Sequence, residues 1–252
     1  MTEEYCDCWE YDDSPSLPLI GDDAPAFEAQ TTNGMMTFPG DYKGKWVILF
    51  SHPADFTPVC TTEFITFANM YDEFKKLNTE LIGLSIDSIF SHVAWLKVIK
   101  DNIEYKGSKN VDVKFPVIAD IKMDVAKKYG MLQPNASDTK AVRAVFIISP
   151  ESIIKAILYY PLSAGRNMQE IKRLLLALQL NAKEGVATPA NWQPGDDVIL
   201  GAPETFKDAK ERDSWKPDGI RTVHSWFLVT KKSAAKPAAK PAAPKKPAAK
   251  KA

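Results

Sequence analysis

The sequence predicts an α/β fold in which helices flank a mixed central sheet. Three observations carry this prediction: a length and composition suited to a buried core, apolar runs of strand length, and amphipathic segments between those runs. The chain has 252 residues, of which 45% are hydrophobic and 25% charged. This is ordinary usage for a globular protein with one large domain, or with a main domain and a smaller one.

Four apolar runs have the length of strands and supply the sheet. They span residues 46–51, 81–86, 142–148 and 153–159. Runs that are apolar almost throughout, and not only at alternate positions, are typical of strands that are covered on both faces. The sequence therefore predicts a sheet buried between layers.

Three amphipathic segments supply the helices. Residues 61–76, 92–103 and 167–182 carry apolar side chains at spacings of three and four, the repeat of a helix with one buried face. The first two lie between apolar runs, so strands and helices interleave, and this order is typical of α/β layers. The third helix is expected to close the main domain.

Changes in composition divide the chain into four parts: residues 1–20, 21–185, 186–230 and 231–252. The first part lacks sustained periodicity and is expected to be an extended N-terminal arm, and the second is the main domain. The third is rich in Pro, Trp and Gly, with strand-like pieces at 197–200 and 223–229, and is expected to form a small second domain. The fourth is a Lys/Ala/Pro tail, expected to be disordered because its prolines break any helix that the alanines favour.

The charge is distributed unevenly, although 32 basic and 32 acidic residues balance in the whole chain. Eight lysines and no acid lie in residues 231–252, which leaves 24 basic against 32 acidic residues, or about −8, in the rest. An acidic body argues against specific nucleic-acid binding, which needs clustered Lys and Arg. The basic tail is expected to be a solubilising appendage, or else a weak tether to nucleic acid or to an anionic membrane.

The chain is expected to be cytoplasmic. It has no run of 18 apolar residues, and its N-terminus is acidic, so neither a membrane span nor a signal peptide is expected. Its three cysteines, Cys6, Cys8 and Cys60, do not form the framework of a disulfide-rich secreted protein. A thiol role in a reducing compartment fits better.

Cys60 is the first candidate for chemistry, because it lies in the first turn of the helix that follows a buried strand. Unpaired backbone N–H groups and the positive end of the helix dipole favour a thiolate there. The alternative is an inert buried cysteine, which is the commoner fate of an isolated thiol.

The residues before Cys60 decide between these alternatives. The spacing Pro53-x-x-x-Thr57-x-x-Cys60 resembles the active-site signature of the peroxiredoxins (AhpC/TSA type), and the string HPADFTPVCTTE from His52 to Glu63 is similar to their one-cysteine, peroxiredoxin-6-like class. In this interpretation the Thr57 hydroxyl holds the thiolate and a peroxide oxygen together, and Pro53 shields the pocket from water.

The resemblance extends from about Asp23 to Val229 and implies a thioredoxin-like fold. Residues 21–185 would then be the peroxidase domain, and residues 186–230 a small C-terminal peroxiredoxin domain of the dimerisation type. The implied assembly is a homodimer or a decamer. The implied partners are a hydroperoxide substrate and a thiol reductant such as thioredoxin or glutathione, and neither a cofactor nor a metal is implied.

Arg143 is the expected cationic partner of the thiolate. It interrupts an otherwise apolar strand, where a buried charge is costly unless an anion accompanies it. A guanidinium at the site would favour the thiolate and stabilise charge on the departing oxygen. The alternative is an arginine that faces solvent from an edge strand.

Three further residues are expected to support the site. Arg166 corresponds to a second arginine near the pocket, Glu63 to an acid that orients the arginine, and His52 to a group that tunes the thiolate. Their alternatives are a surface charge at a helix start, a capping glutamate in the first turn, and a packing histidine at a strand end.

The expected cycle begins with attack of the Cys60 thiolate on ROOH and leaves a sulfenic acid, which a second thiol must reduce. No cysteine follows Cys60, so an external thiol is the simplest reductant. Cys6 or Cys8 on the arm is the other candidate reductant. The alternatives for these two cysteines are free surface thiols or metal ligands, although two cysteines without nearby histidines make a poor metal site.

Three other activities are disfavoured. A thiol-disulfide oxidoreductase normally needs Cys-x-x-Cys, but this chain has Cys60-Thr61-Thr62-Glu63. A non-catalytic chaperone or scaffold would not need Pro53, Thr57, Cys60 and Arg143 together. The phospholipase activity of some one-cysteine relatives uses a serine just before the buried strand, where this chain has Lys45, so we expect no lipase activity.

Overall fold

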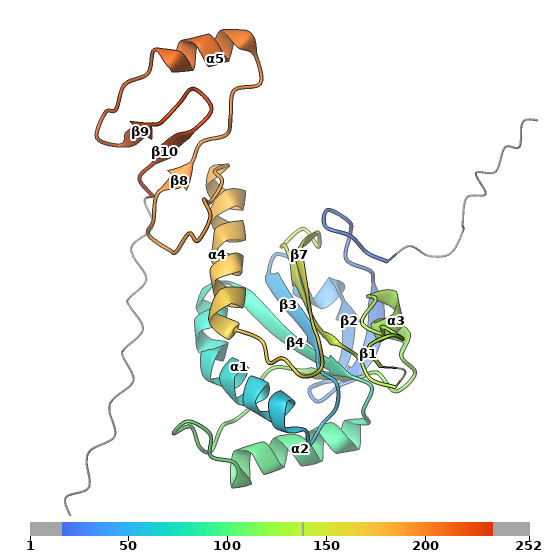
Figure 1. The fold of residues 1–252 in the computed structure, drawn as a ribbon. Coiled ribbons are helices and arrows are strands. Elements are labelled where there is room, and N and C mark those ends of the chain that lie inside the picture. The colour runs from blue at the N-terminus through green and yellow to red at the C-terminus, as the bar shows by residue number, and fades with distance from the viewer. Residues whose placement is uncertain (1–16, 138, 234–252) are drawn as a thin grey trace, which may run out of the picture. The chain divides into compact units, whose positions relative to one another are not determined.

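The computed structural model describes residues 17–137 and 139–233. The chain divides after Arg166 into two compact units (Figure 1). Among the described residues, no helix combines the length and the apolar character needed to cross a bilayer. Cys6, Cys8 and the tail beyond Ser233 lie outside the described residues.

The first unit is built on a seven-stranded mixed sheet in the order β2-β1-β5-β4-β3-β6-β7. β3 pairs in parallel with β4, and β4 with β5, whereas the other neighbours are antiparallel. The strands are β1 (Phe27–Thr31), β2 (Gly34–Phe38), β3 (Trp46–Ser51), β4 (Thr79–Ser85), β5 (Val117–Ala119), β6 (Arg143–Ile148) and β7 (Ile154–Tyr160). The predicted mixed sheet is confirmed.

The four apolar runs form the centre of this sheet and its β7 edge. Every residue of β3, β4 and β6 is buried, as expected for strands that are covered on both faces. β1, β2 and β5 were not predicted. β5 has only three residues, and only the first and last residues of β1 are buried, so neither shows a long apolar run.

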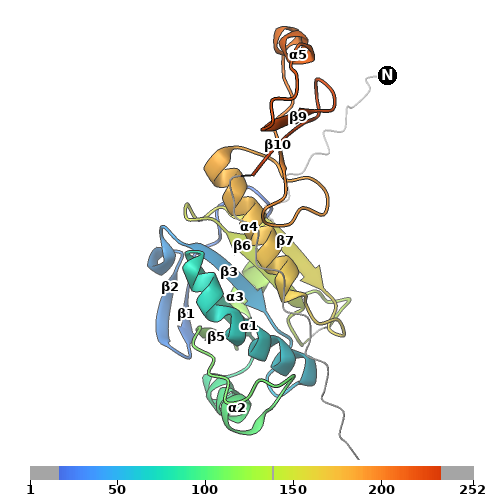
Figure 2. The ribbon, with the colours of Figure 1, turned by 90° about the vertical axis from the view of Figure 1, so that its left-hand side faces the viewer.

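Helices cover the sheet as the amphipathic segments predict. α1 (Pro58–Lys76) packs against β4, and α2 (Ile89–Asn102) packs against β5 (Figures 1 and 2). α1 begins three residues earlier than predicted because Thr57 takes the extended N-cap conformation and Pro58 suits the first helical position. Two short elements, the 3₁₀ turn Gly40–Tyr42 and α3 (Asp124–Lys128), complete the unit.

An aromatic cluster fixes α1 on the sheet. The ring of Phe50 in β3 lies 4.4 Å from Phe67, 5.6 Å from Phe64 and 5.7 Å from Phe115, centroid to centroid. A Cβ atom at Gly83 in β4 would lie 3.3 Å from the Phe64 ring and 3.4 Å from the Phe50 ring. Glycine at this position therefore lets the Phe50 and Phe64 rings approach the backbone of β4. The contacts of Phe64 and Phe67 with Phe50 hold α1 against β3.

The second unit contains α4 (Met168–Glu184), α5 (Phe206–Asp213) and a three-stranded sheet in the order β8-β10-β9. The strands are β8 (Val198–Ile199), β9 (Arg221–Val223) and β10 (Val229–Lys231). α4 starts at an Asn167 cap that accepts bonds from the amides of residues 169 and 170, and it ends at Gly185, whose φ is 64°. A small core joins α4 to the sheet: Ala177, Leu180, Val186, Trp192 and Val198.

The prediction of one strand over residues 223–229 was wrong. β9 ends at Val223 and β10 begins at Val229, so the residues between them form the turn of a hairpin. The apolar side chains that suggested a strand, Trp226 and Phe227, are 42% and 53% exposed. Local apolar character therefore predicted a strand wrongly here, because tertiary packing leaves these side chains at the surface.

Candidate active site

The chain segment between β3 and α1 places Cys60. Phe56 has a φ of 55°, a left-handed conformation that bulky residues rarely adopt and that is often found at functional sites. Thr57 follows in the extended conformation as the helix N-cap, and its hydroxyl donates to the carbonyl of Ala54 at 2.8 Å. Cys60 is then the third residue of α1, within the turn whose N–H groups have no helical acceptor, and it is fully buried.

Arg143, the first residue of β6, brings a guanidinium to this thiol. Its Nη1 lies 3.3 Å from Cys60 Sγ and 2.9 Å from Glu63 Oε2. Its Nε and Nη2 both donate to the carbonyl of Leu162, at 3.0 and 2.8 Å. Only 3% of Arg143 is exposed, and β6 lies between β3 and β7, so the edge-strand alternative is wrong.

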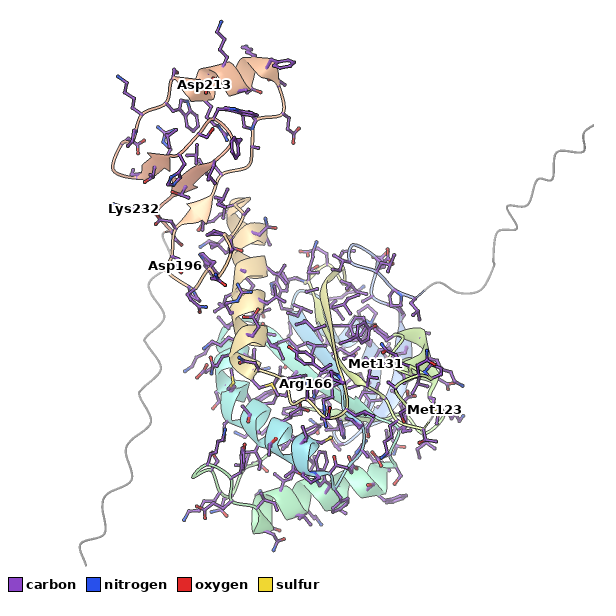
Figure 3. The ribbon with its side chains drawn as sticks, viewed as in Figure 1. Met123, Met131, Arg166, Asp196, Asp213 and Lys232 are labelled. Carbon is purple, nitrogen blue, oxygen red and sulfur yellow. The ribbon has the colours of Figure 1, made fainter. Side chains whose placement is uncertain are left out.

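Arg166, labelled in Figure 3, holds the other side of the Glu63 carboxylate. Its Nε and backbone N–H donate to Oε1 at 3.0 and 2.8 Å, and its Nη2 donates to Oε2 at 2.6 Å. Its Nη1 donates to the carbonyls of Ser51 and Ala144. The guanidinium also lies 5.1 Å from the Phe50 ring centroid. Arg166 is buried, so it is not the surface charge that was the alternative.

Glu63 is therefore a buried carboxylate shared by two arginines, and not a capping residue of the first turn. Burial alone would raise its pKa, but the guanidiniums of Arg166 and then Arg143 outweigh burial and hold the pKa of Glu63 below its usual value. The ionised Glu63 in turn fixes the orientation of the Arg143 fork toward the sulfur.

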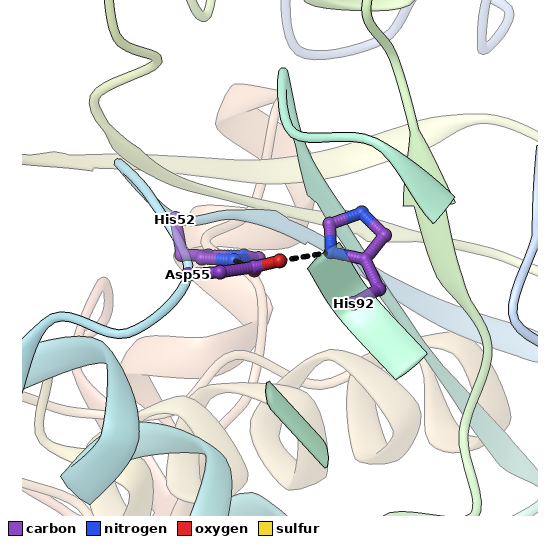
Figure 4. A group of neighbouring side chains, drawn as sticks. All are labelled: His52, Asp55 and His92. Carbon is purple, nitrogen blue, oxygen red and sulfur yellow. Dashed lines mark hydrogen bonds and ion pairs between the residues drawn. The ribbon is translucent and has the colours of Figure 1, made fainter. Parts of the chain in front are cut away.

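His52 belongs to a second buried network, which lies beside the first. Its Nε2 is 3.0 Å from Asp55 Oδ1, and the other carboxylate oxygen is 2.8 Å from His92 Nδ1 (Figure 4). His92 Nε2 reaches the carbonyl of Ile118 at 3.1 Å. Burial lowers the pKa of His52 in spite of Asp55. The hydrogen bonds from the two rings outweigh burial and hold the pKa of Asp55 far below its usual range.

The same three side chains are a group of potential metal ligands within the described part of the chain, with donor atoms within 4.8 Å of one another. Both carboxylate oxygens lie at hydrogen-bonding distance from the imidazole rings, whereas His52 Nδ1 has no hydrogen-bond partner among the described residues.

Lys45, the residue on which the expected absence of lipase activity rests, forms an ion pair with Glu80 at 2.9 Å.

The structure thus gathers Cys60, Glu63, Arg143 and Arg166 into one hydrogen-bonded cluster. Pro53 is buried in the loop that joins this cluster to the histidine network, and Thr57 is partly buried at the helix cap. Sequence reasoning missed Asp55 and His92 as functional candidates. The sequence offers one local signal for Asp55: it is an acidic residue within the motif from His52 to Cys60, and it is not at a helix-capping position.

Comparison with known proteins gives a consistent result. The model of the AhpC/TSA family matches residues 20–157, and that of the C-terminal domain of 1-Cys peroxiredoxin matches residues 177–212. A peroxiredoxin of Methanosarcina mazei is 67% identical over 220 residues, covering 87% of this chain and 100% of the relative. A peroxiredoxin of Aquifex aeolicus is 51% identical over 227 residues, covering 86% and 98%.

Two solved structures are similar over most of the chain. A yeast mitochondrial 1-Cys peroxiredoxin is 40% identical with a TM-score of 0.72, covering 86% of this chain and 100% of its own. The peroxiredoxin 6 of Arenicola marina is 34% identical with a TM-score of 0.73, covering 86% and 99%. The predicted thioredoxin-like fold is therefore confirmed, and the chain belongs to the AhpC/TSA family of peroxiredoxins, which are thiol-dependent peroxidases.

Proposed function

We propose that this peroxiredoxin reduces hydrogen peroxide and organic hydroperoxides to water and alcohols through a sulfenic acid on Cys60. The observation that carries the proposal is the 3.3 Å contact between Arg143 Nη1 and a buried sulfur in the first turn of a helix. A buried cation favours a thiolate beside it, and the helix terminus adds to the effect.

The proposed step is a nucleophilic displacement on oxygen. The Cys60 thiolate attacks the terminal oxygen of ROOH, an S–O bond forms, the O–O bond breaks, and RO⁻ leaves and takes up a proton to become ROH. Arg143 stabilises the negative charge as it moves from sulfur to the leaving oxygen. The Thr57 hydroxyl has its proton engaged by Ala54, so its oxygen is available to accept the peroxide hydrogen.

An external thiol is the proposed reductant of the sulfenic acid, because no cysteine follows Cys60 in the sequence. The thiol of the yeast structural relative is resolved via the glutathione and thioredoxin systems, which supports the same class of reductant here. Attack by Cys6 or Cys8 is the alternative, and it would give a disulfide to Cys60.

Assembly and location are also proposals. We assign residues 21–185, which include α4 of the second compact unit, to the peroxidase domain, and residues 186–230 to a domain that helps to form a homodimer or a decamer. The match of residues 177–212 to the C-terminal domain of 1-Cys peroxiredoxin supports this assignment. A cytoplasmic location fits a protein whose activity needs a reduced thiol.

The proposal is tested by mass spectrometry after a short exposure to one equivalent of hydrogen peroxide. In the wild type and in the Cys6→Ser/Cys8→Ser double variant, we expect the peptide containing Cys60 to carry one adduct of a sulfenate-specific carbon nucleophile, which forms a thioether with the sulfur as the sulfenic oxygen leaves as water. A disulfide of Cys60 that forms in the wild type but not in the double variant would show that Cys6 or Cys8, and not an external thiol, reacts with the sulfenic acid. Oxidation of Cys60 no faster than that of a surface thiol would contradict the proposed function.

Arg143→Lys is expected to slow the reaction of Cys60 with peroxide by about 10- to 100-fold. Lysine keeps the charge but loses the planar fork that contacts Sγ, Glu63 and Leu162 together, and a hydrogen bond to a charged group contributes about 1.5–3 kcal/mol. Stopped-flow measurement of the second-order rate constant checks this, with Arg173→Lys in α4 as a matched control. An unchanged rate would remove Arg143 from the proposed mechanism.

A further inference from the structure

Asp55 connects the loop before α1 to two other elements. Its side chain contacts His92 of α2, which reaches β5 through the carbonyl of Ile118. Its backbone N–H donates to Asp87 Oδ2 at 3.0 Å, and Asp87 also accepts the hydroxyl of Ser85 at 2.7 Å. The loop is thus tied to α2, to β5 and to the end of β4 through one residue.

The partners in this network fix where its protons lie. A carbonyl oxygen only accepts, so His92 Nε2 carries a proton toward Ile118. The Asp55 carboxylate also only accepts, so a hydrogen bond between the two side chains needs the donor on His92 Nδ1. The His92 ring therefore lies between two acceptors, the Asp55 carboxylate and the Ile118 carbonyl, in a site shielded from water.

His52 takes the neutral form in the same network. Its Nε2 donates to Asp55 Oδ1, and its Nδ1 has no hydrogen-bond partner among the described residues. A charged imidazolium at His52 would be costly away from water, and burial lowers the pKa of His52. Asp55 therefore selects the Nε2–H tautomer of His52 and leaves the Nδ1 lone pair free.

We propose that Asp55 and His92 are positioning residues of the peroxidase reaction, in which His92 holds the Asp55 carboxylate and Asp55 holds the loop from His52 to Thr57. The inference rests on the proposed function. It follows from the place of Asp55, two residues from both Pro53 and Thr57, and next to Phe56, whose left-handed backbone needs support from its surroundings. Neither residue touches the reacting atoms in this account.

The first test removes the donor from His92. His92→Phe keeps an aromatic ring but removes its hydrogen-bond donors. The Asp55 side chain is then bonded only to His52, and the loop loses its hydrogen-bonded link to α2 and β5. We expect the second-order rate constant of Cys60 with hydrogen peroxide to fall by about 10- to 100-fold, because a misplacement of 1 Å can cost about 100-fold. Ile99→Val, a small change at another buried position of α2, is the control and should leave the rate unchanged.

The second test separates positioning from charge. In Asp55→Asn the amide oxygen can accept from His52 while the amide nitrogen donates to a neutral His92 Nδ1, so every bond of the network survives. We expect this variant to react within about threefold of the wild type, whereas Asp55→Leu should lose as much as His92→Phe. If Asp55→Asn falls as far as Asp55→Leu, the positioning role is wrong and charge is what matters. This pair decides the question even if His92→Phe does not fold.

A spectroscopic readout tests the network without any activity. The chain has three histidines, and His224 is exposed and serves as a reference. Long-range ¹H–¹⁵N spectra at neutral pH should show a proton on His92 Nδ1, and only Nε2 of His52 protonated; in Asp55→Asn the proton on His92 Nδ1 should be absent. An Nδ1–H tautomer for His52, or a His92 Nδ1 without a proton in the wild type, would overturn the inference.

Failure of the inference can be told from failure of the proposed function. A wild type that reacts no faster than Cys60→Ser overturns the proposed function and the positioning role with it. A reactive wild type with His92→Phe at the wild-type rate overturns the positioning role alone.

Discussion

Replacing Cys60 by serine is expected to abolish peroxide reduction. A serine hydroxyl stays protonated near neutral pH, and an alcohol is a far weaker nucleophile toward oxygen than a thiolate. Arg143 would then contact a neutral oxygen and would have no thiolate to activate. The loss should return the rate to that of the uncatalysed reaction, a fall on the order of 10⁶-fold.

The measurement is peroxide consumption with dithiothreitol as reductant. Cys6→Ser/Cys8→Ser is the matched control, because it removes the chain's other two thiols and leaves the cluster around Cys60 intact. With an external thiol as reductant, the control should retain the wild-type rate. If Cys60→Ser kept a tenth of the activity, the assignment of the nucleophile would be wrong; if the control lost all of it, turnover would require Cys6 or Cys8.

Local patterns predicted two members of the cluster around Cys60, and the resemblance to the peroxiredoxins supplied Glu63 and Arg166. Arg143 is a charge in an apolar strand, and Cys60 follows a strand at the first turn of a helix. The apolar runs of β3, β4 and β6 predicted the centre of the sheet because burial on both faces leaves a continuous signal in the sequence.

The histidine network could not be predicted in this way. Asp55 and His92 are 37 residues apart, and their hydrogen bond exists only because α2 packs beside the loop. Neither residue breaks a pattern in its own segment, since polar side chains are ordinary in a loop and in a half-buried helix. The same limit applies to β5, where three residues are too few to show a period.

Glu63→Leu is expected to destabilise the folded protein by about 3–5 kcal/mol, as found when one partner of a buried ion pair is removed. Leucine has nearly the volume of glutamate but leaves the guanidiniums of Arg143 and Arg166 buried with no carboxylate. Because Glu63 also holds Arg143 Nη1 in place, peroxide reduction should fall with stability. Urea unfolding followed by circular dichroism measures the first effect.

Glu80→Gln provides the matched control. Glu80 also bridges two cations, Lys45 and Lys75, but their ammonium-bearing side chains are 43% exposed. Solvent screens such a pair, so its removal should cost less than about 1 kcal/mol. Equal losses in the two variants would mean that burial between the arginines does not set the importance of Glu63.

The decrease of folding stability at acid pH provides a separate test of Glu63. The pKa of Glu63 is lower in the folded protein than in the unfolded chain, so its ionised form stabilises the fold fully above the unfolded value, and this contribution is lost as the pH falls through the folded value. Wild-type stability should therefore decline below about pH 4.3, the ordinary pKa of a glutamate. Glu63→Gln has no proton to gain and should show a shallower decline, with Asp55 still contributing in the same direction. A decline as steep as that of the wild type would show that Glu63 is not ionised between the two arginines.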